Sequence, residues 1–295
     1  MTTPRNKQLG SRSANRSKKR RNLKGIFGLL AVSVVTLGLA FALLGPPILA
    51  KGLKYEVFAD DLEDVSALAF DRNGDLYATL EKTRGRGRVV HIRQGLIRTV
   101  LDGLDKPDGM LLRGDTLYIT GETGDHGLIV YESGKVRYVD HLSGTEGIAS
   151  AGEEKILVVE DRKQDGRLLR VNPSTGEVEI LLEGLKQPES VCQSPEGRIY
   201  FVEKALHNLS VYADGQHTAA VTGLESPAFL NCLADGSILI TEDRTNFGRL
   251  LRYREGGIEV LARNLRAPQT VAIGADGAFY VSEQRKNRIL KIYEP

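Results

Sequence analysis

The sequence predicts an all-β fold, a six-bladed β-propeller preceded by one N-terminal transmembrane helix. Three observations lead to this fold class: a six-fold repeat with a period near forty residues, short strand-like runs separated by turn motifs within each repeat, and an uncharged apolar segment behind a basic tail. Together they divide the chain into a tail over residues 1–24, a membrane anchor over residues 25–50 and a propeller over residues 51–295.

The repeat consists of six segments that begin with a leucine and continue into an apolar run, such as "LDKPDGMLLRGDTLYITGE" and "LESPAFLNCLADGSILITED". Successive first leucines are 42, 38, 43, 39 and 41 residues apart. Within each period, four β-rich runs are joined by turn motifs such as "SPEG" and "ADGS". Four strands in about forty residues is the pattern of a propeller blade, so six periods predict six blades. A β-sandwich is the weaker alternative. The leucines that begin the six repeat segments are Leu62, Leu104, Leu142, Leu185, Leu224 and Leu265.

The phase of the repeat predicts how the ring closes. "YEVFA" at residues 55–59 has the pattern of an outer strand, whereas the chain ends on "RILKIY" at residues 288–293, which has the pattern of a third strand. The last blade therefore lacks its own fourth strand, and we expect the first segment to supply it. Such closure removes an exposed sheet edge.

The N-terminal segments predict a single membrane span. Residues 1–24 carry nine basic side chains and no acid, and residues 25–50 carry no charge. About 20 apolar residues suffice to cross a bilayer as a helix; the alternative, a cleaved signal peptide, usually has a shorter apolar region and an A-x-A-like site. Because basic tails stay in the cytoplasm, we expect the propeller in the periplasm, a lumen or the cell exterior.

The charge of the propeller argues against nucleic acid as a partner. Without the nine basic residues of the tail, 31 Lys and Arg remain against 38 Asp and Glu, a net charge of −7. A nucleic-acid-binding domain needs basic charge on its folded part. We therefore expect no nucleic-acid partner and a membrane contact through residues 25–50; the small-molecule partner that we expect instead, an anion or a lactone, rests on the arginines and on the resemblance described below.

A column of carboxylates is predicted at one end of the central funnel. Asp108, Glu146 and Glu189 hold the same place at the start of three consecutive innermost strands. Grouped carboxylates raise one another's pKa or require a cation, and oxygen ligands without Cys or His favour Ca²⁺ or Mg²⁺ over zinc. The alternative is that each acid caps its own turn. The full column is Ser66, Asp108, Glu146, Glu189, Ala228 and Gln269.

A second column predicts structural ion pairs. It contains four glutamates, each at the end of a second strand, and three of them have an arginine two residues later. Repeated acid and arginine pairs in repeated turns more often stabilise the fold than catalyse a reaction; arginines that reach the funnel would instead bind an anionic ligand. The residues are Glu160, Glu203, Glu242, Glu283, Arg162, Arg244 and Arg285.

Histidines and cysteines give weaker indications. His126 and His207 lie in loops that could reach the funnel as acid or base, although exposed loop histidines are the commoner case. Cys192 and Cys232 lie on neighbouring innermost strands, one alignment position out of step. We expect this offset to turn their side chains to opposite strand faces, which favours two free thiols over a disulfide.

The repeat units, "PDGM" at residues 107–110, "EG" at residues 146–147 and the terminal "FYVSEQRKNRILKIY" together resemble the SMP-30/gluconolactonase and strictosidine-synthase-like superfamily of propellers. The resemblance implies six blades, a central divalent cation, usually Ca²⁺, and hydrolysis of lactones or esters. It assigns Asp108 and Glu146 to the family's acids at these motifs. The family's usual Asn-Gly has no match, and Glu189 with Ser190 stands in the fourth blade.

Two functions are thus expected. The first is a membrane-anchored, exported, divalent-cation-dependent lactone or ester hydrolase with Asp108 as catalytic residue and Asp108, Glu146 and Glu189 as metal ligands. The second is a non-catalytic binding or scaffolding propeller with a structural ion or none. The fold alone does not choose between them.

Overall fold

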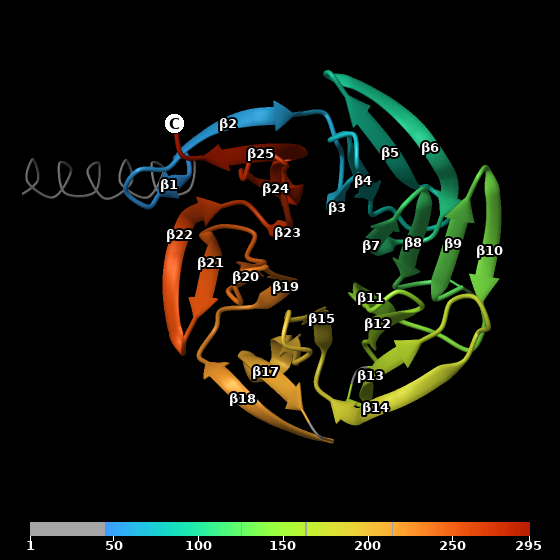
Figure 1. The fold of residues 1–295 in the computed structure, drawn as a ribbon. Coiled ribbons are helices and arrows are strands. Elements are labelled where there is room, and N and C mark those ends of the chain that lie inside the picture. The colour runs from blue at the N-terminus through green and yellow to red at the C-terminus, as the bar shows by residue number, and fades with distance from the viewer. Residues whose placement is uncertain (1–44, 125, 163, 214) are drawn as a thin grey trace, which may run out of the picture. The chain divides into compact units, whose positions relative to one another are not determined.

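The computed structural model describes residues 45–295, apart from residues 125, 163 and 214, and residues 47–295 form one compact unit. This unit consists of six antiparallel sheets arranged in a ring (Figure 1). The predicted all-β, six-bladed propeller is therefore confirmed. The basic tail and residues 25–44 of the predicted anchor lie outside the described residues. Within the described part, no helix is long and apolar enough to cross a membrane.

Each blade has four strands that run from the centre of the ring outward, in the order of the chain. Blade I has β3 (Val65–Phe70), β4 (Leu76–Leu80), β5 (Gly87–Arg93) and β6 (Leu96–Leu104). Blade II has β7 (Pro107–Arg113), β8 (Thr116–Gly121), β9 (Leu128–Glu132) and β10 (Lys135–Val139). Blade III has β11 (Thr145–Ala151), β12 (Lys155–Glu160), β13 (Gly166–Val171) and β14 (Val178–Leu185). Blade IV has β15 (Pro188–Gln193), β16 (Ile199–Glu203), β17 (Asn208–Ala213) and β18 (Gln216–Thr222). Blade V has β19 (Pro227–Cys232), β20 (Ile238–Glu242), β21 (Gly248–Arg254) and β22 (Gly257–Leu265). Blade VI has β23 (Pro268–Ile273), β24 (Phe279–Glu283), β25 (Arg288–Tyr293) and, from the start of the chain, β2 (Lys54–Ala59).

The predicted closure of the ring is also confirmed. The outer strand of blade VI is β2, which pairs antiparallel with β25, and Tyr55 lies opposite Ile292. The two-residue strand β1 (Ile48–Leu49) adds to the outside of blade V by pairing with β22. The ring therefore begins at Pro47, four residues before the predicted start of the propeller.

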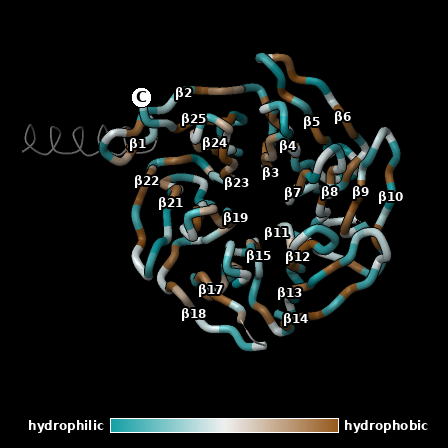
Figure 2. Tube along the Cα trace, viewed as in Figure 1, coloured by the Kyte–Doolittle hydropathy of each residue, from teal (hydrophilic) through white to brown (hydrophobic). Residues whose placement is uncertain are grey.

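The core lies between neighbouring blades. Because side chains alternate between the two faces of a strand, each sheet presents apolar residues both to the blade before it and to the blade after it. Val191 of β15 packs in a cluster with blade III, whereas the next residue, Cys192, packs in a cluster with blade V. Figure 2 shows the resulting pattern of hydrophobic strand segments and hydrophilic turns around the ring.

The expectation of two free thiols is wrong, because Cys192 and Cys232 form a disulfide with a Cα–Cα distance of 5.6 Å. The offset of one position does turn the two side chains to opposite faces of their sheets. However, the two blades face each other across their interface. Cys192 therefore has to lie on the face of its sheet that points to blade V, and Cys232 on the face that points back to blade IV, and these are opposite faces of the two sheets. The bond joins the innermost strands of blades IV and V and encloses a separation of 40 residues.

Candidate functional site

The three predicted carboxylates gather at the end of the ring where the innermost strands begin. Asp108, Glu146 and Glu189 are each the second residue of β7, β11 and β15. Asp108 and Glu189 line a cavity of about 20 Å³ together with Ser66 and Gln269 of the same column. We call this column the inner ring. Its six members are Ser66, Asp108, Glu146, Glu189, Ala228 and Gln269.

Two glycines explain why neighbouring strands bring these acids so close together. A Cβ on Gly109 would lie 2.5 Å from the carbonyl oxygen of Glu146, and a Cβ on Gly147 would lie 2.5 Å from Cα of Ser190. Only a residue without a side chain permits such an approach. The "DG" and "EG" motifs therefore place each carboxylate beside the start of the next blade.

Burial and the repulsion between neighbouring carboxylates favour the protonated forms of Glu146 and Glu189. Glu146 is 6% exposed, and its pKa is raised well above the usual value by burial, by the charge of Asp108 and by a hydrogen bond with the Asp108 carboxyl. Burial also raises the pKa of Glu189 to about 7, although the Lys204 ammonium opposes the shift. The hydroxyl of Ser66 donates a hydrogen bond to Asp108 Oδ1 at 3.2 Å. A cation placed among these oxygens would remove the cost of ionising them.

A second ring of polar residues surrounds the inner ring and was missed by the sequence analysis. Its members directly follow the second strand of each blade, and each donates its backbone N–H to the carbonyl of the residue two positions before the inner ring. We call it the outer ring. Its members are Glu81, Glu122, Asp161, Lys204, Asp243 and Gln284.

The outer ring carries lysine contacts that the sequence analysis also missed. Lys204 Nζ lies 3.3 Å from Glu189 Oε1 and 3.8 Å from Asp243 Oδ2. Lys106, which precedes the "PDG" motif, contacts Glu122 and lies 3.4 Å from Glu81 Oε1. Each lysine thus bridges carboxylates in the funnel.

Glu81, like Glu189, has a carboxyl group whose pKa lies near neutral pH. Burial, followed by the negative charge of Asp108, raises the pKa of Glu81 to about 7. Gln284 Nε2 donates a hydrogen bond to Glu81 Oε2 at 2.8 Å, which fixes this carboxyl across the junction between the last and first blades. A carboxyl with such a pKa can donate or accept a proton at physiological pH.

The predicted glutamate column lies one residue before the outer ring and has the structural role that we expected. The four glutamates are buried inside their blades. Glu160 Oε1, for example, accepts the N–H of Ser143 at 2.9 Å, while Glu160 Oε2 accepts a hydrogen bond from Arg167 Nε at 2.6 Å. The arginine partners were not the expected ones. In blades III, V and VI they come from the third strand: Arg167, Arg249 and Arg288, rather than Arg162, Arg244 and Arg285.

The two loop histidines have other contacts. His126 is exposed and stacks on Tyr138 of the outer strand β10, with 3.7 Å between ring centroids. His207 Nδ1 lies 3.0 Å from the carbonyl oxygen of Leu224. Neither residue lines the cavity between the inner-ring carboxylates.

The opposite end of the channel is wider and carries no charged side chains. A cavity of about 480 Å³ is lined there by the second halves of the innermost strands, including Phe70, Leu112 and Ile273. None of the lining residues carries a charge. We place the functional site at the narrower end because the titratable groups gather there.

Without a bound cation, the stability of the ring is expected to fall as the pH rises. The folded-state pKa of Glu189 is about 7 and its ordinary value is 4.5, so its contribution is fully present below pH 4.5 and is lost as the pH passes about 7. The loss is roughly 3 kcal/mol for this carboxyl. Thermal unfolding in chelator between pH 4.5 and 8.5 measures it. Glu189→Gln should flatten the profile, and an identical profile for the variant would contradict the assignment.

No protein-family model and no curated protein matches the chain. Solved structures with a similar fold include a protein assigned as a gluconolactonase (TM-score 0.65, 12% identity, 83% of this chain and 93% of that chain). Others are a streptogramin B lyase (0.61, 13%, 82% and 98%) and an auxiliary nutrient binding protein from Bacteroides thetaiotaomicron (0.65, 13%, 82% and 77%). At these identities the likeness shows the fold alone. The predicted resemblance to the gluconolactonase type of propeller is confirmed at that level.

Proposed function

We propose that this protein binds a divalent cation, Ca²⁺ or alternatively Mg²⁺, on Asp108, Glu146 and Glu189, and hydrolyses lactones or esters in the funnel. The observation that carries the proposal is the set of three adjacent inner-ring carboxylates, two of which have raised pKa values. Buried like charges without a counter-ion cost several kcal/mol, so the site is suited to a cation.

The donor chemistry fits a hard cation. The polar side chains that line the cavity between the carboxylates offer carboxylate, hydroxyl and amide groups, and no cysteine or histidine is among the lining residues. Oxygen ligands of this kind are those that Ca²⁺ and Mg²⁺ prefer. Lys204 limits the negative charge of the site because its ammonium contacts Glu189.

A bound cation would polarise a carbonyl group and lower the pKa of a water molecule. Of the chain's own residues, Asp108 is the proposed general base, and the hydrogen bond from Ser66 orients its carboxylate. Glu81, with a pKa of about 7, is the proposed proton donor to the leaving oxygen. Four of the six outer-ring residues are acids, so a neutral lactone or ester enters the funnel more favourably than an anion.

For location, we place the basic tail in the cytoplasm, a membrane anchor within residues 25–46 and the ring, which begins at Pro47, on the other side of the membrane. The Cys192–Cys232 disulfide supports export because disulfides persist in oxidising compartments. Protease added outside intact cells or spheroplasts should then digest the ring.

The full-length protein, purified in detergent and stripped with chelator, tests the function. It should bind one Ca²⁺ or Mg²⁺ at the funnel, unfold at a higher temperature with the ion because binding stabilises the folded state, and hydrolyse members of a lactone and ester panel only when the ion is restored. Ion binding without hydrolysis would support the second candidate, a binding propeller, which the fold shared with the nutrient binding protein favours. A thermal midpoint unmoved by either ion would dismiss the metal site.

A further inference from the structure

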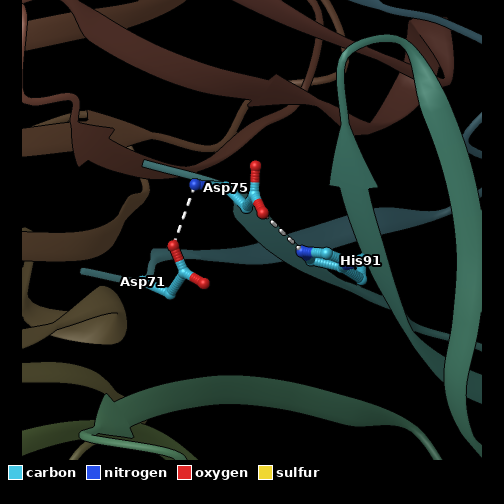
Figure 3. Close-up of side chains that lie close together, drawn as sticks. All are labelled: Asp71, Asp75 and His91. Atoms are coloured by element: carbon cyan, nitrogen blue, oxygen red, sulfur yellow. Dashed lines mark hydrogen bonds and ion pairs between the residues drawn. The ribbon is translucent and has the colours of Figure 1, made fainter. Parts of the chain in front are cut away.

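A second group of ligating side chains lies in blade I, at the opposite end of the innermost strand from the carboxylates of the inner ring. Asp71 and Asp75 are the first and last residues of the turn between β3 and β4, and His91 lies on β5 (Figure 3). One ligand atom from each residue lies within 4.8 Å of the others, and all three side chains are partly buried. The three therefore surround a common point beside the turn.

Local contacts hold these side chains in place. Asp71 Oδ1 accepts the backbone N–H groups of Asn73 at 2.8 Å and Asp75 at 2.9 Å, which fixes the Asp71 carboxylate. The His91 ring packs against Tyr77 with 4.7 Å between centroids. A preorganised arrangement loses less entropy when it binds a ligand.

The imidazole nitrogen that faces the carboxylates lacks a hydrogen bond. His91 Nε2 is buried and makes no hydrogen bond within the described part of the chain, and Asp75 Oδ2 lies 3.3 Å from it as an ion-pair contact. A buried polar atom without a hydrogen bond calls for an explanation such as an ion. The only other cation in contact with Asp75 among the described residues is Arg93, whose side chain is 65% exposed.

Comparison around the ring shows what is particular to blade I. His91 lies opposite Tyr77 in the sheet. The corresponding residues are Arg170, Arg252 and Lys291 in blades III, V and VI, and Val130 and Val211 in blades II and IV. In blade VI, Lys291 Nζ lies 2.8 Å from Asp276 of the corresponding turn. Where blades III, V and VI carry a permanently charged side chain, blade I carries an imidazole that, when neutral, offers a lone pair to a metal.

We propose that Asp71, Asp75 and His91 bind a divalent transition metal of the Zn²⁺ class, at a site separate from the Ca²⁺ or Mg²⁺ site in the funnel. A mixture of imidazole and carboxylate ligands suits Zn²⁺, whereas an all-oxygen set suits Ca²⁺ and Mg²⁺. Three protein ligands leave a fourth position to water. The ion would tie the β3–β4 turn to β5 and so stabilise blade I.

The test uses the full-length, chelator-treated protein carrying Asp108→Asn, so that the funnel site is weakened, and titrates it with ZnCl₂. One Zn²⁺ should bind per chain and raise the thermal midpoint. His91→Lys supplies the residue type found in blade VI; it should weaken Zn²⁺ binding at least about tenfold and leave the metal-free midpoint within a few degrees. His217→Lys, on the outer strand β18, controls for surface histidines and should bind Zn²⁺ like the parent.

Two further variants keep the outcome independent of folding. His91→Gln and Asp71→Asn introduce side chains of similar size, and each removes one of the three proposed ligand groups. Each should therefore bind Zn²⁺ more weakly than the parent. The proposal is overturned if the parent and the His91 variants bind Zn²⁺ equally, or if Zn²⁺ leaves the thermal midpoint of the parent unmoved.

Discussion

Replacing Asp108 with asparagine is expected to weaken Ca²⁺ or Mg²⁺ binding at least about tenfold and to lower lactone or ester hydrolysis about 100-fold or more, as loss of a general base does. The amide keeps the shape of the side chain and can still accept the hydrogen bond from Ser66. It removes one of the three negative charges that attract the cation. Calorimetric titration and initial rates on the same preparation measure both effects.

The same substitution should stabilise the metal-free protein. The charge of Asp108 contributes to the raised pKa values of Glu81, Glu146 and Glu189, so its loss relieves the repulsion among these carboxyls. A higher thermal midpoint in chelator, together with weaker ion binding, is a signature that simple damage to the fold does not produce. Asp115→Asn is the control in the same blade, because Asp115 is exposed and pairs only with Arg72 among the described contacts. If Asp108→Asn retains full ion affinity, the assignment of this carboxylate fails.

The architecture could be predicted because the same local pattern recurs six times. One strand-turn-strand segment such as "LESPAFLNCLADGSILITED" is ambiguous, but six at a nearly constant spacing permit few other folds. The unpaired "RILKIY" at the end of the chain then required an outer strand, and β2 provides it. The inner-ring positions of Asp108, Glu146 and Glu189 followed from the same alignment.

The outer ring could not be placed from the alignment because a shift of one residue changes which direction a side chain faces. Glu160 is buried in its blade and bonds the N–H of Ser143, while Asp161, the next residue, belongs to the outer ring. The acid-rich pattern "VVED" contains both kinds of position without distinguishing them. Lys204 follows Glu203 in the same way.

The disulfide shows a related difficulty between blades. Whether two residues on neighbouring strands meet depends on which blade precedes the other around the ring, and a comparison of aligned segments omits that direction. Cys192 and Cys232 face one another because they occupy opposite faces of consecutive sheets. Packing between repeats thus carries information that the repeat unit alone lacks.

Replacing residues 52–60 with a Gly/Ser linker of equal length is expected to cost most of the stability of the ring. The linker removes the side chains of β2, among them Phe58, whose ring centroid lies 4.9 Å from that of Tyr280. Because Gly and Ser favour strands poorly and bury no apolar surface, we expect the five cross-strand pairs between β2 and β25 to be lost as well. At about 1 kcal/mol for each hydrogen bond and further burial of apolar surface, the loss is on the order of 5 kcal/mol, comparable with the whole stability of many domains. Thermal and urea unfolding of the full-length protein measure it.

A matched pair of single substitutions separates ring closure from strand loss in general. Val57 on β2 and Val136 on β10 both lie on outer strands and have similar exposure, 46% and 41%. Proline at either position interrupts a strand, but of these two strands it is β2 that pairs with β25 and closes the ring, whereas β10 pairs with its chain neighbour β9. Val57→Pro should therefore lower the thermal midpoint more than Val136→Pro. Equal effects would mean that closure by the first strand adds nothing beyond the pairing of an ordinary outer strand.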